Sequence, residues 1–107
     1  MVFGEDVPVA IDRRIDTFLR EWGIPMTNMG YRYLKQLIAY VILHPGVNIK
    51  TAMEEISHSI GIDWRNFQNV IANSIKSCTP PQYANGIDYK PTVKRFVMLC
   101  VNTVLME

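Results

Sequence analysis

Features that mark several common protein classes are scarce in this sequence of 107 residues. It has two cysteines, too few for the disulfide framework of a small secreted domain. Its longest apolar runs, 37–43 and 96–101, are far shorter than the roughly 18 residues that a membrane span needs. The amino-terminal MVFGEDVPVA carries acids where a signal peptide has a basic region and a long apolar core. The sequence therefore predicts a soluble cytoplasmic protein that makes no membrane contact.

Residues that carry catalysis or bind metals are also scarce. The candidate zinc ligands are scattered singly, whereas a zinc site needs them at short paired spacings. They are His44, His58, Cys78 and Cys100. The two histidines and two cysteines offer no local pairing of nucleophile and base, and no glycine-rich phosphate loop is present. The adjacent Glu54 and Glu55 point about 100° apart on a helix, so they form no acid–base pair. We therefore expect no enzymatic activity, no metal and no cofactor, and two buried free thiols.

What the sequence does contain is the apolar spacing of amphipathic helices. Its 49% hydrophobic residues, with eleven basic against ten acidic side chains, are typical of one small globular domain over 1–107. In five segments the apolar residues recur every three or four positions, which predicts an all-α bundle. The predicted helices are 8–22, 27–44, 49–60, 63–77 and 91–106.

The ends and the hydrophobicity of these segments add detail. Thr27 or Asn28 caps the second helix, Gly61 ends the third and Asp63 caps the fourth. The second helix is so apolar that only Lys35 and Gln36 are expected to face water, which predicts that it is central. The last helix is apolar nearly all round, so it either lies deep in the core or forms a homodimer with a second copy of the chain. A loop is predicted over 77–90.

The third and fourth helices are joined by a short connection that contains a glycine, which is typical of a helix-turn-helix over about 51–77. The helix-turn-helix pattern begins at Met53, with Ser57 as its small residue and Gly61 as its turn glycine. Its apolar positions, which hold the two helices together, are Ile56, Ile60, Ile62, Phe67 and Val70. Any two helices packed around a tight turn would give a similar pattern, and that alternative stays open.

If the unit is a helix-turn-helix, its second helix presents a polar face away from the apolar stripe. The residues on that face are Arg65, Asn66, Gln68, Asn69, Ala72, Asn73 and Lys76. Asn and Gln amides match the N6 and N7 edge of adenine in the DNA major groove, and Ala72 allows close approach. Arg65, Lys76 and Lys50 are candidate phosphate contacts. Such a face is also compatible with an ordinary solvated helix.

The charge near this unit is modestly positive. The segment from Gly61 to Arg95 contains five basic and two acidic residues. Such an excess is small for a domain that binds DNA alone.

One stretch resembles a known family. In GIPMTNMGYRYL, Gly23, Ile24 and Pro25, followed by Gly30, Tyr31, Tyr33 and Leu34, resemble the signature of the carboxyl-terminal effector domain of stage zero sporulation protein A, the sporulation master response regulator. Ile38, Ile71 and Ile75, and the segment Lys90, Pro91, Thr92 and Phe96, also match, so that the resemblance runs from about Ile11 to the end.

This resemblance implies an all-helical transcription factor domain whose helix-turn-helix enters the DNA major groove and which binds DNA as tandem dimers. The family's domain follows a phosphorylatable receiver domain, so we expect this chain to be a separated domain or a stand-alone relative. Its predicted reading helix is neutral where the family's is charged, and its connection over 77–89 is shorter. The alternative function is a protein-interaction or dimerisation module that keeps the fold and has lost DNA binding.

Overall fold

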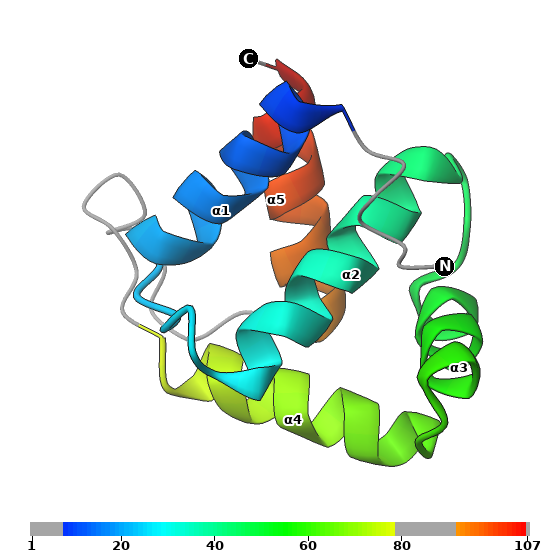
Figure 1. Ribbon diagram of the computed structural model, residues 1–107. Coiled ribbons are helices and arrows are strands. Elements are labelled where there is room, and N and C mark those ends of the chain that lie inside the picture. The colour runs from blue at the N-terminus through cyan, green and yellow to red at the C-terminus, as the bar shows by residue number, and fades with distance from the viewer. Residues whose placement is uncertain (1–7, 79–91, 107) are drawn as a thin grey trace.

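The computed structural model describes residues 8–78 and 92–106, and within these ranges it contains five α-helices and no strand. In chain order they are α1 (Val9–Glu21), α2 (Met29–Leu43), α3 (Ile49–Ile60), α4 (Trp64–Lys76) and α5 (Val93–Met106) (Figure 1). The prediction of an all-α bundle is confirmed, and every observed boundary lies within two residues of the predicted one. Most of the predicted loop over 77–90, and the predicted helix start at Pro91, lie outside the described residues. No described helix has the length and apolar character needed to cross a bilayer.

Local capping chemistry sets where the helices begin and end. Asn28, Asn48 and Asp63 each accept a hydrogen bond from the backbone N–H two residues further on, at 2.9, 2.8 and 2.7 Å respectively. Such bonds satisfy amide groups that have no partner inside the helix. Gly61 ends α3 with a φ of 79°, a left-handed conformation that favours glycine.

The helix α2 is the centre of the fold, as predicted, and it contacts each of the other four helices (Figure 1). Its Leu34, Leu37 and Ile38 are fully buried. The expectation that only Lys35 and Gln36 of this helix face water was wrong, because Arg32 is exposed and both of those side chains are half-buried. Lys35 is drawn inward by two carboxylates of α1.

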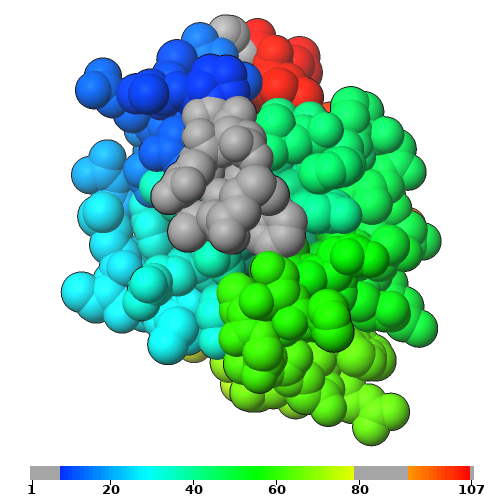
Figure 2. All heavy atoms as spheres, turned by 45° about the vertical axis from the view of Figure 1, so that its right-hand side comes forward, coloured from blue at the N-terminus to red at the C-terminus, as the bar shows by residue number. Residues whose placement is uncertain are grey.

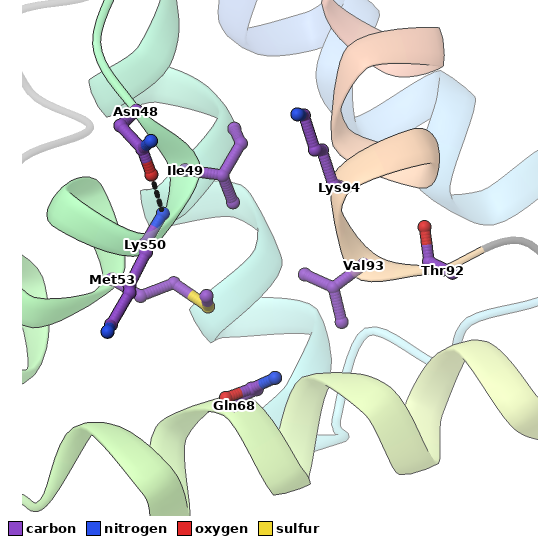
Figure 3. A pocket seen from close by; sticks show the side chains of 8 residues that line it. All are labelled: Asn48, Ile49, Lys50, Met53, Gln68, Thr92, Val93 and Lys94. Atoms are coloured by element: carbon purple, nitrogen blue, oxygen red, sulfur yellow. Dashed lines mark hydrogen bonds between the residues drawn. The ribbon is translucent and has the colours of Figure 1, made fainter.

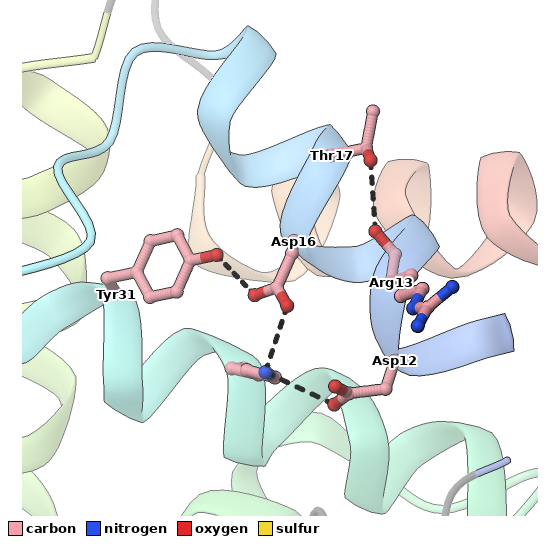
Figure 4. Close-up of polar contacts among 6 residues, drawn as sticks. Asp12, Arg13, Asp16, Thr17 and Tyr31 are labelled. Carbon is pink, nitrogen blue, oxygen red and sulfur yellow. Dashed lines mark hydrogen bonds and ion pairs between the residues drawn. The ribbon is translucent and has the colours of Figure 1, made fainter. Parts of the chain in front are cut away.

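Those carboxylates form a polar cluster between α1 and α2 (Figure 4). The Lys35 ammonium lies 3.2 Å from Asp12 and 3.1 Å from Asp16, and the Tyr31 hydroxyl donates a hydrogen bond to Asp16. Burial first, and then this hydrogen bond, raise the pKa of Tyr31. Burial lowers the pKa of Lys35, but its hydrogen bonds to Asp16 and Asp12 outweigh that effect, and the net pKa is raised.

The last helix, α5, buries one face and exposes the other. Phe96 packs edge-on against Phe18 of α1 and against Trp22, which directly follows α1, with ring centroids 5.6 and 5.3 Å apart respectively. Both cysteines are buried, as predicted, and are not joined in a disulfide with each other, and burial raises the pKa of Cys100. Met98, Leu105 and Met106 remain exposed, so α5 is not buried all round.

A close crossing of α2 and α4 sets how α4 lies on the bundle. A Cβ atom added to Gly30 would lie 1.7 Å from the Ser74 Oγ and 2.7 Å from its Cβ, so only glycine fits here without movement. One turn along α2, the Tyr33 ring stacks on Phe67 with centroids 4.7 Å apart. Phe67 is fully buried, so the two contacts together hold one side of α4 against α2.

We therefore expect Gly30→Ala to lower the free energy of unfolding by about 1–3 kcal/mol, because the added methyl group overpacks the crossing. Urea unfolding followed by circular dichroism measures this change. In a Ser74→Gly background the same substitution should cost less, because the clashing atoms are gone. An equal loss of stability with and without Ser74→Gly would contradict the close contact between Gly30 and Ser74.

The polar cluster predicts alkaline sensitivity. The folded state favours protonated Tyr31 and protonated Lys35, because both pKa values are raised. Their contribution to stability is therefore complete below about pH 10, the ordinary range of these groups, and is lost as the pH rises through the folded pKa values. The free energy of unfolding, measured between pH 8 and 11.5, should fall at the alkaline end. Tyr31→Phe should make that fall shallower, and an unchanged pH profile would count against the cluster.

Candidate nucleic-acid interface

The helices α3 and α4 are joined by Gly61, Ile62 and Asp63 alone. The Ile62 N–H donates to the Ser57 carbonyl at 3.0 Å and the Gly61 N–H donates to the His58 carbonyl at 3.2 Å, which closes the end of α3. Figure 2 shows α3 and α4 at the lower end of the molecule, opposite the end formed by the start of α1 and the end of α5. The pair therefore has one broad side turned to solvent.

Most positions of the predicted helix-turn-helix pattern are at least partly buried. Met53, Ile56, Ser57 and Phe67 are buried. Ile62 and Val70 are half-buried. Ile60 departs from the prediction, because it is 38% exposed. It is the last residue of α3.

The solvent side of α4 carries five of the predicted site residues. They are Arg65, Asn66, Asn69, Asn73 and Lys76, and all five are exposed. The opposite side of the helix is buried through Phe67, Ile71 and Ile75. The exposed side chains thus form one polar line that runs the length of α4, and this line is the candidate interface.

Two other side chains predicted to belong to this face are less exposed than these five. Gln68 and Ala72 are half-buried. Figure 3 shows Gln68 directed toward the start of α5, where it lines a cavity of about 300 Å³ between α3, α4 and α5. The other lining residues are Asn48, Ile49, Lys50, Met53, Thr92, Val93 and Lys94. The reason is geometric, since Gln68 is nearer to the buried stripe of α4 than Asn69 is, and α5 covers that edge.

The remaining predicted site residue, Lys50, lies in the first turn of α3 and is exposed. Its ammonium nitrogen lies 5.5 Å from the centroid of the Trp64 ring, and the Arg65 guanidinium carbon lies 5.8 Å from the same ring. Trp64 is not among the site residues predicted from the sequence. No signal in the sequence links it to Lys50, because the contact joins the starts of two different helices.

The charges around the interface are mixed. Lys94 and Arg95 are exposed at the start of α5, and Glu54 and Glu55 are exposed on α3. Among residues 8–78 and 92–106, Lys35 is the only lysine that forms an ion pair, and its partners are the α1 carboxylates. Within the same ranges, no three His, Cys, Asp or Glu side chains come together as a metal site would require.

A second hollow lies on the other side of the α3–α4 turn. It has a volume of about 260 Å³ and is lined by Met29, Arg32, Tyr33, Gln36, Ile60 and Ile62. Met29 at its edge is 50% exposed. The Gln36 Oε1 atom is buried and has no hydrogen-bond partner among residues 8–78 and 92–106. This groove between α2 and the α3–α4 turn is therefore lined by apolar and polar side chains in nearly equal share.

Comparison of the chain with protein-family models, with curated proteins and with solved structures finds no match.

Proposed function

We propose that this protein binds specific sequences of double-stranded DNA and regulates transcription. In this proposal α3 and α4 are a helix-turn-helix, and α4 enters the major groove. The observation that carries it is the polar line on α4, in which three exposed asparagines lie between two exposed cations. The resemblance to the effector domain of stage zero sporulation protein A supports the same function.

The spacing along α4 suits a groove. Arg65 and Lys76 are eleven residues apart. On an α-helix this separation spans about 16 Å, and the major groove is about 12 Å wide. Cations at the two ends of the line can therefore meet phosphates while the middle of the helix faces the bases.

Asn69 is the best-placed base contact, with Asn66 and Asn73 one turn away on either side. All three amides are exposed and each presents a donor and an acceptor, the combination that adenine offers in the major groove. Gln68 takes a different role, because it faces the start of α5. We assign phosphate contacts to Arg65, Lys76 and Lys50.

A homodimer through α5 belongs to the same proposal. Met98 and Leu105 lie on the side of α5 that is not buried in the core and are 39% and 55% exposed. Two copies that pack these side chains together would form a symmetric dimer that carries two α3–α4 units.

The second candidate function is a protein-interaction module. The groove between α2 and the α3–α4 turn favours it, because Met29 and Ile60 in its lining are exposed apolar side chains that a partner helix would cover. In that case the neutral α4 would be an ordinary solvated helix.

Binding to a pool of genomic DNA fragments separates the two. A DNA-binding protein with three phosphate contacts should retain fragments at 50 mM salt and lose affinity with a slope of roughly 0.9 per contact on a log–log plot. A filter-binding or mobility assay at three salt concentrations measures that slope. The absence of retention at low salt would reject DNA binding and favour the protein-interaction module.

Two substitutions on α4 separate base reading from phosphate contact. Asn69→Ala should weaken binding to the selected site by about 1–3 kcal/mol and leave binding to random DNA almost unchanged. Lys76→Ala should weaken both equally and reduce the salt slope. Equilibrium binding to the selected and to a random duplex measures both effects.

Phe67→Ala is the control for loss of folding, because truncating this fully buried ring should cost about 3–5 kcal/mol of stability. Asn69→Ala and Lys76→Ala alter exposed side chains and should unfold like the unaltered protein. If both variants stay folded and bind DNA unchanged, the polar line is not the interface.

A further inference from the structure

Two cations from different helices lie near one aromatic ring at the start of α4. Lys50 comes from the first turn of α3 and Arg65 from the first turn of α4, and their charged groups lie 5.5 and 5.8 Å from the Trp64 ring centroid. At these distances the negative face of an indole attracts a cation, and tryptophan is the aromatic residue that does so best. The arrangement groups two positive charges next to one end of the polar line.

Neither cation is neutralised by a neighbouring carboxylate. Glu54 lies one turn after Lys50 on α3, the spacing at which lysine and glutamate often pair, yet the described contact of the Lys50 ammonium is with Trp64. Asp63 precedes α4, but its carboxylate caps the helix by accepting from the Arg65 backbone N–H at 2.7 Å. Within 8–78 and 92–106, no ion pair involves Lys50 or Arg65.

The Asp63 cap also decides which groups an anion would meet here. Because the carboxylate already occupies the amide end of α4, an approaching phosphate would bind the Lys50 and Arg65 side chains rather than the backbone N–H groups.

We propose that Trp64 is a positioning residue, which holds the Lys50 ammonium and the Arg65 guanidinium in place for phosphates of the DNA backbone. This inference rests on the proposed DNA binding and assigns Trp64 a part in it. Long cationic side chains lose rotamer freedom when they are fixed in a complex. A ring that restrains both side chains before DNA binds reduces the rotamer entropy lost on binding. The affinity for DNA is then correspondingly higher.

The direct test is Trp64→Leu, which keeps apolar bulk in the half-buried position and removes the ring. Against a duplex of random sequence at 50 mM salt, we expect affinity to fall about three- to tenfold, the effect of one or two cation–π contacts near the surface. Trp64→Phe keeps a ring and should lose less. Each variant is first checked for folding by thermal unfolding, and Trp64→Phe takes the place of Trp64→Leu if the leucine variant does not fold.

The test that isolates positioning is a double-mutant cycle. In a protein that carries Lys50→Ala and Arg65→Ala, the substitution of Trp64 should have no further effect on DNA affinity, because the cations it holds are gone. A purely structural role would lower affinity equally in both backgrounds. A protein that carries Lys76→Ala is the control background, because Lys76 lies at the far end of α4. In that background the Trp64 substitution should lower DNA affinity by the same factor as in the unaltered protein.

The outcomes separate the two proposals. If the unaltered protein does not retain the duplex at low salt, the proposed function and this inference are both rejected. If it does, and the Trp64 substitution has no effect or has the same effect without the two cations, the role of Trp64 is rejected and DNA binding stands.

Discussion

The close approach of α2 and α4 at Gly30 and Ser74 is the constraint on which the candidate interface depends. A side chain on Gly30 would separate the helices, because its Cβ would overlap the Ser74 side chain. With the helices this close, the Tyr33 ring reaches Phe67 and stacks on it. The rotation of α4 about its own axis is thereby fixed, and the side opposite Phe67 is left for solvent or a partner.

The polar line that results is almost neutral along its middle. Three asparagines offer hydrogen bonds without charge, and the cations stand at its ends. In the proposed DNA complex, the cations at the ends would contact phosphates and the asparagine amides would contact bases, because phosphate contacts position a protein on DNA and base contacts specify the sequence. Exposed Glu54 and Glu55 on α3 oppose general attraction to DNA, so the positions of the individual cations matter more than the net charge.

The sequence predicted much of the fold because helix signals are local. Asn28 and Asp63 are capping residues by their chemistry, and Gly61 ends a helix because it accepts a left-handed conformation. The apolar spacing through Phe67 and Ile71 identifies the buried side of α4 whatever that side packs on. The exposure of Asn69 and Asn73 follows from the same periodicity.

The sequence by itself thus determined the five helices, their ends and which side of each is apolar. The tertiary structure alone decided which side chains meet across helices. It turned Gln68 toward α5, drew Lys35 to the carboxylates of α1, and brought Lys50 to the ring of Trp64. These contacts join residues distant in the chain, and helical periodicity specifies the direction of a side chain on its own helix but not the neighbour that it finds there.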